Sequence, residues 1–130
     1  MVHEFAHATS AEEQESLIHQ LNQIRSDVSS MYTIAHIRNT INTQDEFYKT
    51  EHQFFDQNLP RMEALENEFY HALVGSTYRV ELEKQFGTQL FQIAELAIHI
   101  FAPDIVEDLQ ETNQLSTEYN NLLASAQIDF

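Results

Sequence analysis

The chain has 130 residues, of which 21 are acidic and 6 are basic, and its formal net charge is −15. A surface this negative repels phosphate backbones and anionic lipids, so the composition excludes a nucleic-acid-binding or membrane-surface protein. With only two glycines and two prolines, the composition argues against a turn-rich β-sandwich. The absence of cysteine rules out a disulfide framework and a thiolate zinc site.

The chain also lacks targeting features. Its N-terminal residues, Met1–Glu4, have neither the basic nor the apolar region of a signal peptide, and no apolar run approaches the roughly 20 residues of a membrane helix. We therefore expect a cytoplasmic protein.

The first predicted element is a long helix over residues 10–42. Its apolar residues recur in steps of four and three, which is one stripe of a helix: Leu17, Leu21, Ile24, Val28, Met31 and Ala35. Ser10 is followed three positions later by Glu13, and this capping-box spacing predicts the helix start.

A second helix is predicted over residues 44–59. The segment Thr43–Glu46 has the same capping-box spacing, and three phenylalanines are expected to point inward: Phe47, Phe54 and Phe55. Pro60 should end or kink this helix because proline lacks an N–H and clashes with the preceding turn. A third helix is then predicted over residues 60–74.

The rest of the chain is predicted to form short helices over 76–101, separated by Gly87, and a last helix over 103–126. Together these elements predict an all-α fold, an antiparallel bundle or hairpin array of about five to six helices, in a single region 1–130. The chain stops on the apolar segment Leu122–Phe130, which is typical of a cut through a larger protein.

The segment His3–His7 matches the zincin pattern H-E-x-x-H, in which two histidines one turn apart bind Zn²⁺ and the glutamate polarises water. Its context argues against such a site. Only two residues precede His3, and Ser10 starts a new helix soon after the motif. The third ligand is also missing. There is no glutamate between residues 16 and 45, and Glu13 stands where metzincins have histidine. We expect a solvated helical end, and we assign no catalytic, cofactor-binding or metal-binding residue.

Other histidines have glutamates at helical spacing: Glu68/His71, Glu15/His19 and Glu95/His99. Only the first pair has the E-x-x-H spacing of di-iron bundles, which need two such pairs and two further glutamates. The interpretation is again structural. His36 and His52 are expected to be surface or partly buried residues rather than ligands.

From about residue 10 to its end, the chain carries an ordered series of short motifs: Ile37-Arg38, Asp45-Glu46-Phe47-Tyr48, Glu51, Phe54-Phe55-Asp56, Pro60, Tyr70, Leu73, Arg79, Leu82-Glu83, Phe86-Gly87, Leu90-Phe91, Pro103-Asp104-Ile105, Asp108-Leu109-Gln110, Asn113, Leu115-Ser116, Tyr119, Leu122-Leu123-Ala124-Ser125-Ala126, Ile128 and Phe130. This series resembles the N-terminal helices of the oligoendopeptidase F family, which are thimet-oligopeptidase-like zinc metallopeptidases.

The resemblance implies a large, mainly helical, cytoplasmic peptidase that cuts short peptides internally. Its N-terminal helices would form part of the wall around a deep channel. The resemblance also implies that this chain ends at the start of a strand, because a short β-hairpin would begin after Phe130. Its zinc, bound by an H-E-x-G-H helix, would lie well beyond residue 130. Ala6 replaces the glycine of that motif here, so no ligand is transferred to this chain.

Three functions remain open from the sequence. The chain is a non-catalytic module of such a peptidase, a freestanding acidic interaction module, or a small hydrolase that uses His3, Glu4 and His7. The partners implied by the first are the rest of the peptidase chain and its peptide substrates. Self-association is expected through bare apolar residues, with Ile128, Phe130 and part of the Phe47–Phe55 group as candidates.

Overall fold

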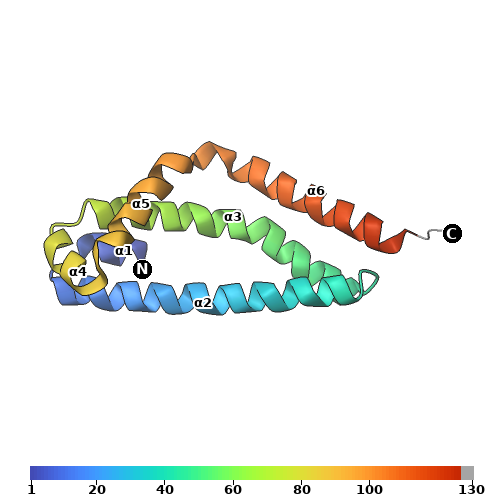
Figure 1. Ribbon diagram of the computed structural model, residues 1–130, viewed down its shortest axis with the longest axis horizontal. Coiled ribbons are helices and arrows are strands. Elements are labelled where there is room, and N and C mark those ends of the chain that lie inside the picture. The colour runs from blue at the N-terminus through green and yellow to red at the C-terminus, as the bar shows by residue number, and fades with distance from the viewer. Residues whose placement is uncertain (127–130) are drawn as a thin grey trace. The chain divides into compact units, whose positions relative to one another are not determined.

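The computed structural model describes residues 1–126, and over that range every regular element is a helix (Figure 1). These helices are α1 (Val2–His7), α2 (Ala11–Ile41), α3 (Glu46–Val74), α4 (Arg79–Phe86), α5 (Thr88–Ile100), the 3₁₀ helix η1 (Pro103–Ile105) and α6 (Val106–Ser125). The predicted all-α class is confirmed. The predicted start of a strand falls after residue 126, outside the described residues. None of the described helices combines the length and apolarity needed to cross a membrane.

The chain divides into two compact units, and both α2 and α3 contribute to each of them. Unit 1 contains Met1–Arg25 and Met62–Pro103. It has an apolar core formed by Phe5, Ile18, Phe69, Leu73, Leu82, Phe91 and Ala94. The rings of Phe5 and Phe69 meet edge to face with centroids 5.0 Å apart. Full burial of one such side chain contributes about 2–3 kcal/mol, so Phe5 fastens the short helix α1 to this core.

Unit 2 contains Ser26–Arg61 and, among the described residues, 104–126. Its buried apolar side chains include Ala35 from α2 and Phe55 from α3. Polar side chains are buried beside them: Asn39, His52 and Asp56. A buried polar group is costly unless it is hydrogen-bonded, so the packing of this unit depends on a polar network.

The two predicted capping boxes have different outcomes. At the start of α2, Ser10 Oγ accepts a hydrogen bond from the Glu13 N–H at 3.2 Å, and the Glu13 carboxylate accepts one from the Thr9 N–H at 2.7 Å. At the start of α3 the prediction was wrong. Asp45, and not Thr43, is the cap, because Asp45 Oδ1 accepts hydrogen bonds from the first backbone N–H groups of the helix.

Pro60 lies inside α3, so the predicted division into two helices, 44–59 and 60–74, was wrong. The proline removes the hydrogen bond to the carbonyl four residues earlier, that of Asp56. Asn113 of α6 donates its side-chain N–H to that carbonyl at 3.4 Å, and Gln110 donates to the adjacent carbonyl of Gln57. Side chains of α6 thus supply donors at the point where the helix lacks one.

The inward direction predicted for the phenylalanines of α3 was correct only for Phe55. Phe55 is buried and packs edge to face against Tyr32 of α2, with ring centroids 5.7 Å apart. Phe47 and Phe54 are exposed. Residues seven apart lie on the same side of a helix, and residue 55 lies about 100° away from residue 54, so α3 turns Phe55 inward and Phe54 outward.

Gly87 is the single residue between α4 and α5, and it has φ +81° and ψ 164°. This conformation is strained for residues that carry a Cβ atom. The glycine therefore ends α4 and lets Phe91 and Ala94 of α5 reach the core of unit 1.

Candidate functional site

The H-E-x-x-H residues lie on α1, which is only six residues long, and His3, Glu4 and His7 are all exposed. Glu4 and His7 use polar atoms in other interactions. Glu4 forms an ion pair of 2.8 Å with the N-terminal ammonium, whose hydrogen bond and charge lower the pKa of the Glu4 carboxyl. His7 Nδ1 donates to the His3 carbonyl at 2.7 Å. An open pocket of about 560 Å³ borders Glu4 and His7.

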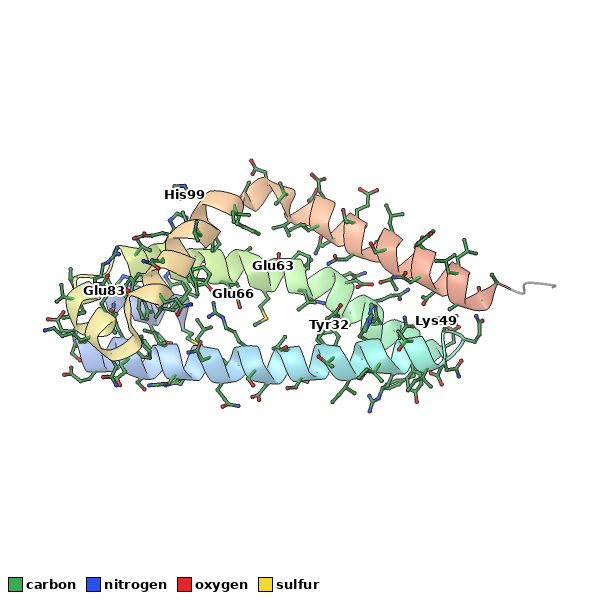
Figure 2. The ribbon with its side chains drawn as sticks, in the orientation of Figure 1. Tyr32, Lys49, Glu63, Glu66, Glu83 and His99 are labelled. Carbon is green, nitrogen blue, oxygen red and sulfur yellow. The ribbon has the colours of Figure 1, made fainter. Side chains whose placement is uncertain are left out.

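The other sequence candidates are dispersed. Glu68 and His71 are exposed on α3, and Glu15 forms a 3.8 Å contact with His19 on α2. Glu95 pairs with Arg79 at 2.9 Å, and His99 of α5 is exposed (Figure 2). Within the described residues, no three histidine or carboxylate side chains are close enough to hold a metal ion.

Two arginines are held in unit 1 by glutamates and aromatic rings. Arg25 Nε donates to Glu66 at 2.7 Å, and the guanidinium lies over the Tyr70 ring. Arg79 bonds to Glu83 and Glu95 and lies over the Phe91 ring. The hydrogen bonds that Arg79 donates to Glu83 and, to a lesser extent, to Glu95 raise the pKa of its guanidinium group. Both clusters use their charged groups to fasten neighbouring helices.

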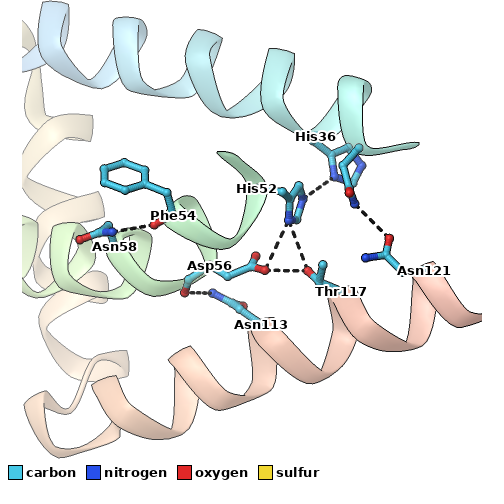
Figure 3. Close-up of polar contacts among 9 residues, drawn as sticks. His36, His52, Phe54, Asp56, Asn58, Asn113, Thr117 and Asn121 are labelled. Atoms are coloured by element: carbon cyan, nitrogen blue, oxygen red, sulfur yellow. Dashed lines mark hydrogen bonds and ion pairs between the residues drawn. The ribbon is translucent and has the colours of Figure 1, made fainter. Parts of the chain in front are cut away.

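Unit 2 contains a connected polar cluster, which joins α2, α3 and α6 (Figure 3). His36 Nδ1 of α2 lies 3.1 Å from His52 Nε2 of α3. The other ring nitrogen of His52, Nδ1, lies 3.3 Å from Asp56 Oδ2. Thr117 Oγ1 of α6 donates to the same carboxylate oxygen at 2.8 Å. His52 and Asp56 are buried, whereas His36 is exposed.

Amide side chains extend this cluster toward the ends of α2 and α6. Asn39 Nδ2 donates to Asn121 Oδ1 at 3.1 Å. Asn39 Oδ1 is buried and has no hydrogen-bond partner among the described residues. A pocket of about 350 Å³ is bordered by both asparagines and by His36, His52 and Thr117. The described residues that line the pocket present imidazole, amide and hydroxyl groups.

The cluster contains a hydroxyl, an imidazole and a carboxylate, yet its geometry is not that of a nucleophilic triad. In a triad the carboxylate binds one ring nitrogen and the other nitrogen accepts the proton of the nucleophile. Here Thr117 and Asp56 both lie beside His52 Nδ1, and His52 Nε2 faces His36. The Thr117 hydroxyl donates its proton to Asp56, so it is not activated for attack. The arrangement fits a buried structural network that fixes three helices.

Sequence reasoning did not single out this cluster. The four-residue spacing of His52 and Asp56 on one helix was a usable local signal, because residues four apart share a helix face. His36 and Thr117 reach the cluster from other helices, and Thr117 lies 61 residues beyond Asp56 in the chain. Only the packing of α2 and α6 against α3 brings them together.

The chain is similar to known proteins in both sequence and structure. A sequence profile of the peptidase M3 N-terminal domain matches residues 1–101. The chain belongs to the peptidase M3 family. No curated protein matches it.

Solved structures extend the family relationship over nearly the whole chain. An oligoendopeptidase F is 46% identical with a TM-score of 0.91, and a PZ peptidase A in complex with an inhibitor is 48% identical with a TM-score of 0.91. A protein from Bacillus anthracis str. Ames that is identified as an oligoendopeptidase F is 42% identical with a TM-score of 0.90. Each match covers 99% of this chain but only 23–24% of the other. The chain therefore corresponds to about a quarter of the length of each of these proteins.

Proposed function

We propose that the chain is the non-catalytic N-terminal helical segment of a cytoplasmic, zinc-dependent oligoendopeptidase that hydrolyses short peptides. In this proposal its helices form part of the wall that limits access to the substrate channel. The observation that carries the proposal is the match of 99% of this chain to about a quarter of two oligoendopeptidase F structures, at 46% and 42% identity, and of a PZ peptidase A structure, at 48% identity. At this identity, the segment is expected to serve its relatives' role within a longer chain.

The residues of this chain do not fit the zinc ion that the family implies. The Glu4 carboxylate is paired with the N-terminal ammonium, and His7 Nδ1 is bonded to the His3 carbonyl. Helix α1 ends at His7, and the described residues supply no third ligand beside it. We therefore place the zinc in the remainder of the peptidase and derive no catalytic step from this segment.

The wall function is supported by how the helices are held. In unit 2, the cluster of His52, Asp56 and Thr117 fixes α3 to α6, and the pair of His36 with His52 fixes α2 to α3. Such buried, directional contacts favour one arrangement of these helices over alternatives. A channel wall that excludes folded proteins needs this rigidity, and it needs no reactive group.

The test uses the complete peptidase chain. With zinc bound, it should hydrolyse a short quenched peptide but leave the same sequence uncut within a loop of a folded protein. A His52→Ala variant, which loosens unit 2, should raise cleavage of the folded substrate relative to the peptide. A variant whose ratio equals that of the wild type would contradict the wall function. An open reading frame that stops shortly after codon 130 would instead favour a freestanding interaction module.

A further inference from the structure

The outer side of α2 in unit 2 carries a row of bare apolar side chains. Met31 is 57% exposed, Ile34 and Ile37 are each 49% exposed, and Ile41 is 76% exposed. We call these four residues the α2 seam. On the same stretch of helix, Ala35 and Asn39 are buried against the rest of the unit. One side of α2 is thus used within the unit, and the α2 seam is left uncovered among the described residues.

The spacing of the α2 seam is that of a helix-packing face. Ile34, Ile37 and Ile41 follow one another in steps of three and four, which keeps them in one row along the helix. This is the repeat that places apolar side chains along the contact line of two packed helices. Three β-branched side chains in such a row can insert between the side chains of a second helix.

The surroundings of the α2 seam are depleted of negative charge. The chain has 21 acidic residues, yet none lies between Asp27 and Asp45. The neighbouring exposed residues include Ser26, Ser29, Ser30, Thr33 and Thr40, which are small and uncharged, and also His36. Arg38, the one basic residue of this stretch, forms a 2.9 Å pair with Glu51. Loss of charge around exposed apolar residues is the compositional signature of an interface core and is unusual for a solvated helix face in so acidic a chain.

We propose that the α2 seam is the docking surface for an apolar helix in the remainder of the peptidase chain. The inference rests on the proposed function and identifies the surface by which this segment is attached. Relatives that match 99% of this chain contain it as only 23–24% of their length, so about three quarters of each relative lies outside this region. A second copy fits less well as the occupant, because each copy carries a net charge of −15 and the two would repel each other.

The absence of native cysteine in the 130 residues provides a direct test. An Ile37→Cys variant is made both in this chain and in the complete peptidase, and a maleimide reagent labels position 37, which is read by peptide mass spectrometry. Residue 37 should be labelled at least about tenfold more slowly in the complete peptidase, since a packed interface must open before reaction. A Ser29→Cys variant, exposed on another side of the same helix, is the matched control and should be labelled at similar rates in both proteins.

Two results would overturn the proposal. Equal labelling of position 37 in the two proteins would show that the remainder of the peptidase leaves the α2 seam bare. Labelling of the 130-residue chain that slows as its own concentration rises would show that a second copy is the occupant. Zinc-dependent cleavage of a short peptide is measured on the same complete chain. If the wild-type complete chain shows no zinc-dependent cleavage, that result counts against the proposed function, independently of the labelling result.

Discussion

His36 Nδ1 of α2 lies 3.1 Å from His52 Nε2 of α3, so one proton between the two rings can satisfy both nitrogens. The two histidines do not contribute equally. His52 is buried and also contacts Asp56, whereas His36 is exposed and water can replace its partner.

The first prediction compares these two histidines. A His52→Ala substitution should lower the free energy of unfolding by about 1–3 kcal/mol, because it leaves the buried Asp56 carboxylate with one fewer partner and opens a cavity. His36→Ala should cost under about 1 kcal/mol because its site is open to water. Urea denaturation of the 130-residue chain measures both values. Equal losses would show that the buried contacts of His52 add nothing.

The second prediction concerns the helical hydrogen bond that Pro60 removes. In a Pro60→Ala variant the new N–H can donate to the Asp56 carbonyl, which Asn113 serves in the native chain. Helix propensity alone favours alanine by about 3 kcal/mol. The packing free energy that is lost when the buried proline is replaced by a smaller side chain reduces this gain.

A double-mutant cycle separates these effects. Asn113→Ala should cost more stability in the presence of Pro60 than in the Pro60→Ala background, because only Pro60 leaves the Asp56 carbonyl dependent on the asparagine. Identical costs in the two backgrounds would mean that Asn113 does not compensate for the proline.

The third prediction tests the start of α3. Asp45→Ala should destabilise the chain by about 0.5–2 kcal/mol, because Asp45 Oδ1 caps the N–H groups of Phe47 and Tyr48. Thr43→Ala is the control and should change stability by no more than about 0.5 kcal/mol. Thermal unfolding followed by circular dichroism compares the two variants. A larger loss at Thr43 would restore the cap expected from the capping-box spacing.

The fourth prediction concerns activity. The isolated 130-residue chain should not hydrolyse a short quenched peptide when zinc is added, since Glu4 and His7 are engaged and the neighbouring described residues offer no third ligand. A His3→Ala variant should therefore behave like the wild type in the same fluorescence assay. Zinc-dependent cleavage that disappears in this variant would establish a metal site on α1.

The sequence was sufficient to predict the fold class, because an apolar period near 3.6 and the scarcity of glycine and proline leave helices as the favoured structure. It could not decide which phenylalanine of α3 faces inward. Phe54 and Phe55 are adjacent, and only the neighbouring Tyr32 of α2 selects Phe55. Pro60 was expected to end or kink a helix, and the division at residue 60 was predicted because a local rule cannot include the donors that α6 supplies.

The polar cluster of unit 2 was equally beyond a local reading. The spacing of His52 and Asp56 is visible in the sequence, but many acidic helices contain such a pair. The pair becomes part of a network that joins three helices because tertiary packing brings Thr117 of α6 and His36 of α2 beside it. The H-E-x-x-H match is the converse case, since its pattern is conspicuous and its three polar residues are exposed on a short helix.

The backbone at Gly87 has a stereochemical consequence. A Cβ atom built there would meet no other atom within 4 Å, so space does not restrict this position. The restriction comes from φ +81°, which an L-residue avoids because of its handedness. The mirror image of this φ,ψ pair falls at the edge of the extended region that L-residues adopt readily. The junction of α4 and α5 therefore selects against the chirality of a side chain rather than its size, and a D-alanine incorporated by chemical synthesis would suit it better than its L-enantiomer.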